Sequence, residues 1–165
     1  MKKIVSIVCV IALCLGVLAG CGQKIEAQEE TIVKLVWNGT TTEVKTSQWN
    51  DKSTQVSTED ASLGGGKVYD FVGVKLSTLM EIAGAGDCTK AIVKSSDGYS
   101  AEVAVEDIKA YDITLVTAYA SGKLLEEDAG GPLKLVYPIT EHPELNDTYD
   151  AWSWQWYVCE VEFVK

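Results

Sequence analysis

Three tryptophans near the end of the 165-residue chain have a spacing that suits the binding of a flat ligand. Trp152, Trp154 and Trp156 occupy every second position, and Tyr149 precedes them. Because alternate residues of a β-strand share one face, three indoles on such a strand could stack on a planar ring. The alternative is that these aromatic side chains pack in the core or at the edge of the domain.

Two further candidate groups are a turn sequence and a pair of lysines. The sequence Ser-Ser-Asp-Gly at residues 95–98 is typical of a hairpin turn, so Asp97 and Tyr99 could offer a carboxylate and a phenol to a ligand at its tip. The simpler alternative is an ordinary Asp-Gly turn. Lys94 and Lys134 are candidate contacts for an anion, against the alternative that both ammonium groups are solvated.

Metal-dependent and hydrolytic chemistry find little support in the sequence. His142 is the only histidine, whereas zinc sites usually need several His or Cys ligands at close spacing. The acidic residues around it lack the alternating ligands and central glycine of an EF-hand loop. No Gly-x-Ser-x-Gly nucleophile elbow occurs. We therefore assign no metal ligand and no catalytic residue.

Cys21 predicts where the protein works. It follows Leu-Ala-Gly, an apolar run at residues 4–18 and the basic start Met-Lys-Lys. The run is shorter than the roughly 20 residues that a spanning helix needs, so it is typical of a signal peptide. The small residues before Cys21 suit a lipoprotein signal peptidase, after which the thiol carries the lipid. The alternatives are an ordinary secretory signal or a buried core segment.

This pattern predicts a signal peptide at residues 1–20, a lipidated tether at 21–30 and one domain at 31–165. The protein would then be lipid-anchored to the cell membrane on its extracytoplasmic side, and two or more acyl chains would make the anchoring stable. In such a compartment Cys88 and Cys159 could form a disulfide, and two buried free thiols are equally plausible.

The charge of the chain limits its partners. The formal net charge is −10, so we expect no binding to nucleic acid and repulsion from anionic lipid head groups. All 14 basic residues are lysine. The bidentate guanidinium fork that grips phosphate or carboxylate is therefore absent, and an anionic ligand would depend on lysine, backbone N–H groups or hydroxyls.

Hydropathy patterns predict a single α+β domain in which strands predominate. One helical face is expected at Leu76, Leu79, Met80 and Ala83. The last segment alternates, which predicts a terminal strand with Tyr157, Cys159, Val161 and Phe163 facing the core. The polar stretch at residues 47–66 is predicted to be a long loop. Further strands are expected at residues 32–37, 40–44, 91–94, 99–105, 113–119 and 133–137.

From about Tyr69 onward, the order of these signals resembles the molybdopterin-binding oxidoreductase domain of the sulfite oxidase type. Five short stretches carry the resemblance in the family's order: Gly73–Met80, Ser96–Ser100, Leu115–Tyr119, Ser121–Leu124 and Gly130–Pro138. The resemblance implies the mixed α+β sulfite oxidase fold, with a pterin-type ligand held in a cleft between loops.

Three departures from the family concern its chemistry. Catalytic members bind molybdenum through a cysteine thiolate in a loop upstream of the Gly73 stretch, and residues 47–71 contain no cysteine. A histidine and an arginine of the family are replaced here by Ala129 and Lys134, which weakens the grip on the phosphate of molybdopterin. The resemblance therefore implies a retained scaffold that could bind a pterin, or molybdopterin without stable molybdenum ligation.

Three functions are consistent with the sequence. The first is a membrane-anchored, non-catalytic protein that binds a small flat ligand or serves as an accessory to a membrane redox partner. The second is an active molybdopterin-dependent oxidoreductase subunit that uses another ligand from the loop, with Ser57 and Ser62 as the candidates. The third is a structural or interaction lipoprotein whose cleft is empty, with its tryptophans packed shut.

Overall fold

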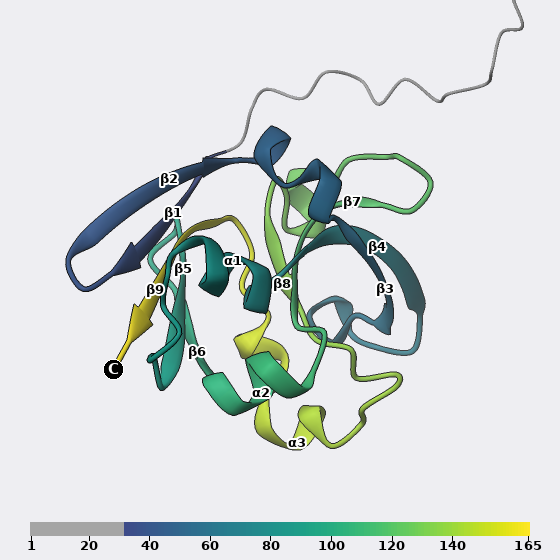
Figure 1. The fold of residues 1–165 in the computed structure, drawn as a ribbon. Coiled ribbons are helices and arrows are strands. Elements are labelled where there is room, and N and C mark those ends of the chain that lie inside the picture. The colour runs from purple at the N-terminus through teal and green to yellow at the C-terminus, as the bar shows by residue number, and fades with distance from the viewer. Residues whose placement is uncertain (1–31) are drawn as a thin grey trace, which may run out of the picture.

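Two β-sheets form the framework of residues 32–165, the part of the chain that this computed structural model describes (Figure 1). The five-stranded sheet has the order β2-β1-β9-β5-β6, and its strands are β1 (Ile32–Trp37), β2 (Thr40–Lys45), β5 (Lys90–Ser95), β6 (Ser100–Ala104) and β9 (Val158–Val164). The four-stranded sheet has the order β3-β4-β7-β8, and its strands are β3 (Thr54–Glu59), β4 (Val68–Lys75), β7 (Thr114–Tyr119) and β8 (Lys134–Val136). The predicted α+β class with a predominance of strands is confirmed.

The C-terminal strand lies in the middle of the five-stranded sheet. β9 pairs with β1 in parallel and with β5 in antiparallel orientation. Val161 of β9 lies opposite Leu35 on one side and Val93 on the other, and all three are buried. The loop that leads into β9, which carries the tryptophans, is therefore fixed to the centre of a sheet.

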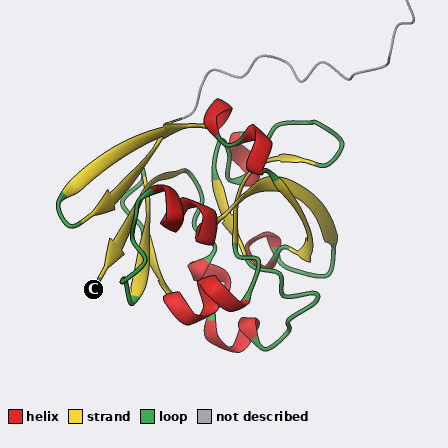
Figure 2. Cartoon of the chain, in the orientation of Figure 1, coloured by secondary structure: helices red, strands yellow, loops and turns green. Residues whose placement is uncertain are grey.

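Helical segments are short and lie at the connections between strands, as Figure 2 shows. The α-helices are α1 (Leu76–Ile82), α2 (Val105–Ala110) and α3 (Leu145–Thr148). Single 3₁₀ turns occur at η1 (Thr46–Gln48), η2 (Asn50–Lys52), η3 (Ala61–Leu63), η4 (Glu127–Ala129) and η5 (Ala151–Ser153). The predicted helical face of α1 is confirmed, because Leu76, Leu79 and Met80 are buried. The sequence does not predict α2 and α3, since helices of 6 and 4 residues are too short to show a periodic face.

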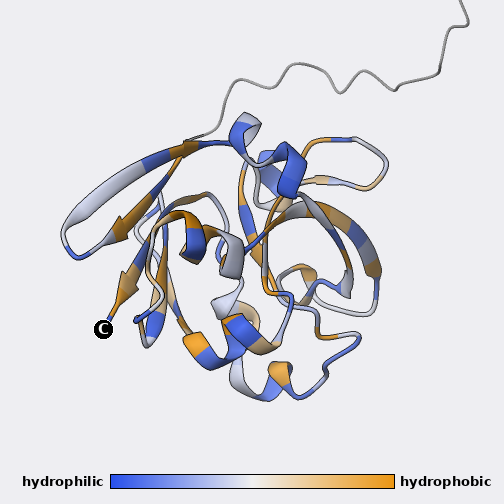
Figure 3. Ribbon diagram, in the orientation of Figure 1, coloured by the Kyte–Doolittle hydropathy of each residue, from blue (hydrophilic) through white to orange (hydrophobic). Residues whose placement is uncertain are grey.

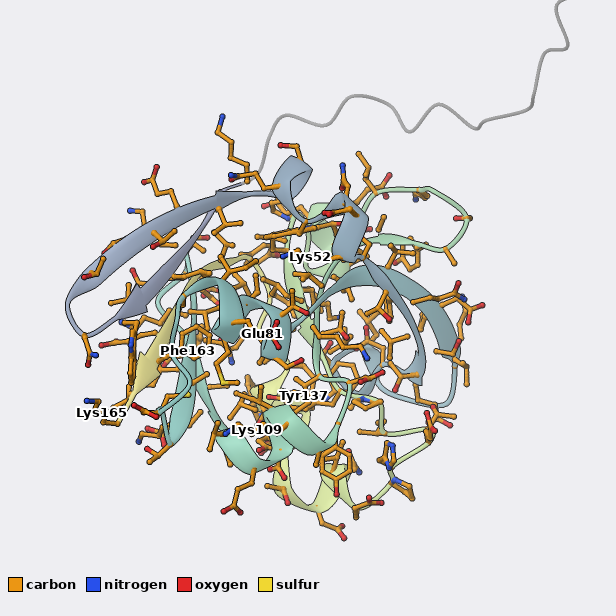
Figure 4. The ribbon with its side chains drawn as sticks, viewed as in Figure 1. Lys52, Glu81, Lys109, Tyr137, Phe163 and Lys165 are labelled. Carbon is orange, nitrogen blue, oxygen red and sulfur yellow. The ribbon has the colours of Figure 1, made fainter. Side chains whose placement is uncertain are left out.

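A hydrophobic core extends across both sheets and α1. Its buried members run from Val33 in β1 to Phe163 in β9, and Tyr137 lies near the middle of the side chains in Figure 4. Buried and more exposed residues alternate along β5 and β6, which therefore turn one face to this core, and Figure 3 shows hydrophobic and hydrophilic positions along the strands. Because residues 32–164 contain this core and both sheets, the domain from residue 31 onward has the interior it needs to fold by itself.

Two hairpins follow directly from local sequence. Asn38 and Gly39 have positive φ angles of 50° and 77°, the turn geometry expected between β1 and β2. β5 and β6 pair in antiparallel orientation around the next predicted turn, where Gly98 has a φ of 95°. Both predicted hairpins are therefore confirmed.

The loop predicted at residues 47–66 is wrong in its middle. β3 runs there and pairs in antiparallel orientation with β4. Thr58 of β3 is fully buried, and its hydroxyl donates a hydrogen bond of 2.8 Å to the carbonyl of Tyr137. A polar residue thus fills a core position, which hides the apolar alternation that would have revealed the strand.

The strand predicted to carry the tryptophans begins only at Val158. Residues 151–153 form η5 instead, because the Asp150 carboxylate accepts hydrogen bonds from the backbone N–H groups of Trp152 and Ser153 at 3.1 and 3.2 Å. This cap turns the chain where the spacing of the indoles suggests an extended segment. The prediction that all three tryptophans share one strand face is therefore wrong.

The terminal strand does not place Cys159 in the core. Its register against β5 shifts between Lys94 and Ser95. Val158 is buried instead, together with Val161, whereas Cys159 is half-buried. The regular alternation that the sequence suggests begins only after this irregularity.

The predictions for residues 1–31 lie outside the described part of the chain. They comprise the signal peptide, the tether and the lipidation of Cys21. Within residues 32–165, none of the helices combines the length and the apolar character that crossing a membrane requires. The membrane anchor therefore stays a prediction.

Candidate functional site

A pocket of about 260 Å³, termed here the aromatic pocket, opens between the β5–β6 turn and the loop that leads into β9. Its lining residues are Ser62, Ser95, Asp97, Tyr99, Ala151, Trp152, Trp154, Gln155, Trp156 and Tyr157. The fold thus brings together six of the candidate residues singled out from the sequence, which are Ser62, Asp97, Tyr99 and the three tryptophans. Because they come from three segments far apart in the chain, the pocket exists only in the folded domain.

The aromatic walls differ in their exposure. Trp152 is 81% exposed and Trp154 only 2%, while Trp156 is half-buried. Tyr99, on the opposite segment, is 65% exposed. Trp152 and Tyr99 therefore leave much of their ring surface free for a ligand, whereas the Trp154 ring, at the inner wall of the pocket, is almost completely covered.

A buried polar pair holds the two sides of the pocket together. The Ser95 hydroxyl donates to the side-chain oxygen of Gln155 at 2.9 Å, and both residues are buried. The Gln155 amide nitrogen in turn donates to the carbonyl of Trp152 at 2.8 Å. Sequence reasoning missed both residues, because a serine and a glutamine 60 positions apart give no local signal of their pairing.

Lys134 is neither solvated nor an anion contact, so both interpretations of it are wrong. Its ammonium forms an ion pair with the Asp60 carboxylate, and both side chains are completely buried. Burial lowers the pKa of Lys134, while the charge and the hydrogen bond of Asp60 oppose that shift. Among the described residues, Asp60 supplies the counter-charge in this interior site, and it belongs to the segment predicted to be a loop.

The same carboxylate extends to the wall of the aromatic pocket. The other Asp60 oxygen accepts hydrogen bonds from the backbone N–H and the hydroxyl of Ser62, at 3.1 and 2.6 Å. The Ser62 hydroxyl accepts one from the indole N–H of Trp156 at 2.9 Å. The Lys134 ammonium lies 4.9 Å from the centroid of the Trp156 ring. This Lys134–Asp60–Ser62–Trp156 network fixes one wall of the pocket.

Asp97 is the one charged residue among those that line the aromatic pocket in the described structure. Its carboxylate accepts a hydrogen bond of 3.2 Å from the backbone N–H of Tyr99, so it also shapes the turn. The turn interpretation and the ligand interpretation of Asp97 are therefore compatible. An exposed carboxylate beside aromatic ring faces favours a ligand without negative charge.

One buried donor at the pocket has no partner among the described residues. It is the indole N–H of Trp154. The Trp154 ring packs against Tyr137 with their centroids 5.6 Å apart, which holds it in place. An unpaired buried donor costs roughly 1–3 kcal/mol, so an acceptor on a ligand would remove that penalty.

A larger hollow of about 460 Å³ adjoins the aromatic pocket and shares Tyr157 with it. Its other lining residues are Ser96, Leu125, Glu127, Gly131, Pro132, Val158 and Cys159. We term it the Cys159 hollow. The thiol of Cys159 lies 3.6 Å from the carbonyl oxygen of Lys94, and its pKa is raised by burial and by the charge of Glu160. The thiol is therefore protonated at neutral pH.

Lys94 lies outside the aromatic pocket. Its ammonium pairs with the carboxylates of Glu160 and Glu162 at 2.8 and 2.6 Å, on the surface of the sheet formed by β5 and β9. These hydrogen bonds raise the pKa of Lys94. The lysine is therefore a partly exposed side chain that is already paired with two carboxylates, and it is not a free anion contact.

Tyr149 also lies outside the pocket, in the core. Its ring stacks on that of Tyr137 with centroids 4.5 Å apart, and its hydroxyl donates to Asp107. Burial, followed by the hydrogen bond to Asp107, raises the pKa of Tyr149 to about 12. The packing alternative holds for this aromatic residue.

Of the two alternatives for Cys88 and Cys159, the structure has free thiols and not the disulfide. Cys88 is buried, with its sulfur 3.5 Å from that of Met80. Cys159 lies on β9 in the wall of the Cys159 hollow. The alternative of two buried free thiols holds for Cys88 alone.

The remaining candidates do not build a second site. Ser57 is exposed on β3 and donates its hydroxyl to Asp70. His142 packs edge-on against Tyr111, with ring centroids 4.8 Å apart. No group of three or more His, Cys, Asp or Glu side chains within residues 32–165 is placed to hold a metal ion.

Residues 24–141 match the family described as the oxidoreductase molybdopterin binding domain. In fold, the chain is similar to the sulfane dehydrogenase SoxCD from Paracoccus pantotrophus, with a TM-score of 0.60 and 16% sequence identity. That similarity covers 81% of this chain and 38% of the other, and at such identity it concerns the fold alone. No curated protein sequence matches the chain. Six of the ten residues that line the aromatic pocket, all within positions 151–157, lie beyond the family match.

Proposed function

The chain belongs to the family of oxidoreductase molybdopterin-binding domains, and on this premise we propose that it is a non-catalytic, ligand-binding lipoprotein. Its domain has the strand-rich α+β fold of the sulfite oxidase type. It uses the aromatic pocket to bind a small flat ligand, as an accessory to a membrane redox partner. The observation that carries the proposal is that the pocket keeps its aromatic walls and lacks the groups that would hold molybdopterin.

The side chains at the pocket do not fit a molybdenum centre. Residues 47–71, where catalytic relatives carry the thiolate ligand, contain no cysteine, and they include η2, β3, η3 and the start of β4. Ser62 is the residue of this segment that reaches the pocket, and its hydroxyl is already bonded to Asp60 and Trp156. Cys159 lies on β9 in the neighbouring hollow, outside the segment in which catalytic relatives carry the thiolate.

The phosphate of molybdopterin also lacks a partner. Lys134, at the position of the family's arginine, is buried in its ion pair with Asp60. In the described structure no lysine lines the aromatic pocket or the Cys159 hollow. At about 260 Å³ the aromatic pocket is smaller than the roughly 300–1,000 Å³ typical of sites for drug-sized ligands. A single ring system fits this chemistry and size, and complete molybdopterin does not.

Metal and pterin analysis tests the proposal. When residues 31–165 are produced in a host that makes molybdopterin, we expect the purified domain to carry no stoichiometric molybdenum. Elemental mass spectrometry measures the metal, and fluorescence of an oxidised extract measures any bound pterin. Replacing Ser57 or Ser62 by alanine should leave both results unchanged. Stoichiometric molybdenum in the wild-type domain would contradict the proposal.

An active oxidoreductase subunit is the second candidate, and one observation favours it. Cys159 lines a hollow together with Gly131 and Pro132, which belong to the family stretch at residues 130–138. If Cys159 were a metal ligand, replacing it by serine would abolish molybdenum retention. Under the leading proposal the same variant behaves like the wild type in the metal analysis.

The membrane anchor has its own test. Replacing Cys21 by serine is expected to abolish labelling by a fatty-acid analogue and to leave a precursor that retains residues 1–20, because serine offers no thiol for the lipid. Metabolic labelling and mass spectrometry of the intact protein measure both effects. Cys88→Ser, at a buried thiol of the domain, should label normally. Labelling that persists in the Cys21→Ser variant would rule out this anchor.

A further inference from the structure

We propose that the aromatic pocket selects a flat organic cation that carries a hydrogen-bond acceptor, and that it rejects the matching anion. The inference rests on the proposed function, because it concerns the ligand of the same pocket. It sets the pocket apart from a site for a phosphate-bearing cofactor. Three independent features carry it: the charges at the opening, the exposed rings and the unpaired indole donor.

The charged side chains that line the aromatic pocket and its two neighbouring hollows are all acidic in the described structure. Asp97 lines the aromatic pocket, and Glu127 lines the adjoining Cys159 hollow. A third opening is formed by Glu126, Glu127 and Asp128, and it shares Tyr157 with the other two. The carboxylates of Asp97, Glu127 and Asp128, in hollows that share Tyr157, attract a cation and repel an anion, and the attraction is strongest at the shortest distance, beside Asp97.

The lysines that lie near these hollows are neutralised by other partners. Lys134 has its ammonium 4.9 Å from the Trp156 ring, and it is paired with buried Asp60. Lys123 pairs with Glu126 at 3.0 Å. An anionic ligand would therefore meet the negative charges without a compensating free ammonium group.

The exposed rings are the second feature. Trp152 and Tyr99 are two of the four large apolar side chains that the described structure leaves exposed, and both line this pocket. The face of an aromatic ring attracts a cation, and tryptophan does so best. With the Asp97 carboxylate on the same turn as Tyr99, the walls offer ring faces and a negative charge to one bound cation.

The unpaired donor of Trp154 is the third feature. Its N–H is buried, its ring is held by Tyr137, and the side chain lines the pocket. A ligand with a carbonyl acceptor would pair this donor, whereas a ligand without one would leave it unsatisfied. The ligand that suits the pocket therefore combines two properties, a positive charge on its ring and a hydrogen-bond acceptor next to the ring.

Titration of residues 31–165 with 1-methylnicotinamide, nicotinamide and nicotinate tests the charge preference. The three probes share one ring and a carbonyl acceptor, and they are cationic, neutral and anionic. Tryptophan fluorescence reports binding, and calorimetry checks the stoichiometry. We expect the cation to bind at least about tenfold more tightly than the anion.

The variant Asp97→Asn assigns this preference to one residue. Asparagine keeps the side-chain oxygen that accepts the Tyr99 N–H, so the turn is preserved. We expect this variant to lower the affinity for 1-methylnicotinamide roughly tenfold and to leave the affinity for nicotinamide unchanged. Glu81→Gln is the matched control, because it removes one negative charge from α1. Glu81, which is labelled in Figure 4, lines none of the three hollows. It should leave all affinities unchanged.

The variant Trp154→Phe tests the acceptor. It keeps an aromatic ring and removes the N–H, so 1-methylnicotinamide should bind roughly tenfold more weakly. The probe 1-methylpyridinium has the charge and the ring without the carbonyl, and its affinity should not change. Circular dichroism verifies that the variant is folded, and if it is not, the comparison of Asp97→Asn with Glu81→Gln decides alone.

The outcomes separate this inference from the proposed function. Equal affinity for nicotinate and 1-methylnicotinamide, or unchanged cation affinity in Asp97→Asn, overturns the charge preference and leaves a pocket that binds flat ligands. If neither the three probes nor a pterin binds, the ligand-binding function itself fails. Tight binding of the cation that depends on Asp97 and on the Trp154 N–H supports both.

Discussion

Replacing Asp60 by alanine is expected to lower the free energy of unfolding by about 3–5 kcal/mol, the cost of breaking a buried ion pair from one side. The ammonium of Lys134 would remain in a completely buried site without its counter-charge. Ser62 would also lose the acceptor for its backbone N–H and its hydroxyl. Urea unfolding followed by tryptophan fluorescence measures the effect, which should move the midpoint and leave the slope unchanged.

A double variant distinguishes the effect of breaking the ion pair from the effect of removing side-chain volume. Asp60→Leu combined with Lys134→Met replaces both charges by apolar groups, a change that is often neutral or stabilising. It should therefore recover most of the stability that Asp60→Ala loses. As a surface control, Lys123→Met removes the exposed pair with Glu126 and should cost less than about 1 kcal/mol. A wild-type midpoint for Asp60→Ala would refute this account of Lys134.

The same magnitude explains why Lys134 is a poor phosphate ligand. If its ammonium turned outward to an anion, Asp60 would be left buried and unpaired, at a cost of about 3–5 kcal/mol. A phosphate would have to offset that cost before it gained any affinity, in surroundings where the lining charges are acidic. The ion pair thus supports the pocket wall through Ser62 and Trp156 while it removes the positive charge from the site.

Elements that depend on neighbouring residues could be predicted from the sequence. The β1–β2 hairpin follows from Asn38 and Gly39, which adopt the positive φ angles that the turn needs. Helix α1 follows from the spacing of Leu76, Leu79 and Met80, all of which are buried. In both cases the determining interactions lie within a few residues, and the pattern contains them.

Features that depend on distant partners could not be predicted. Lys134 and Asp60 are 74 positions apart, so nothing near either residue shows that both are buried. Thr58 fills a core position of β3 because its hydroxyl reaches the carbonyl of Tyr137, 79 positions away. Polar residues at both places are typical of solvated segments, and only the fold supplies the partners that make their burial tolerable.

The tryptophan cluster is an intermediate case. The sequence indicates correctly which residues gather, since Trp152, Trp154 and Trp156 all line one pocket. The reason it suggests, a common strand face, is wrong, because the Asp150 cap bends the chain into η5. The pocket forms because the β5–β6 turn, which carries Tyr99, lies next to residues 151–157. The local sequence pattern does not show this contact between distant segments.

Replacing Gly73 by alanine is expected to cost more than about 3 kcal/mol and to prevent stable folding at 37 °C. A Cβ at this position would lie 2.1 Å from the carbonyl oxygen of Leu115 and 2.6 Å from Cα of Val116. These atoms belong to the backbone of β7, at the point where the register of β4 against β7 shifts. Overpacking against movable side chains costs typically 1–3 kcal/mol, and a backbone neighbour cannot move aside without breaking the ladder. Thermal unfolding of the variant and its yield of soluble protein measure the effect.

The contrast with another glycine shows what the family stretch at residues 73–80 encodes. A Cβ at Gly86 meets no atom within 4 Å, so Gly86→Ala should change the free energy of unfolding by less than about 0.5 kcal/mol. If Gly73→Ala proved equally harmless, the close approach of β4 and β7 would be wrong. If the two differ as expected, Gly73 is required by strand packing and by no ligand. The family stretch at residues 73–80 then specifies the fold through the close packing of β4 and β7. The proposed choice of ligand depends instead on other residues, those that line the aromatic pocket.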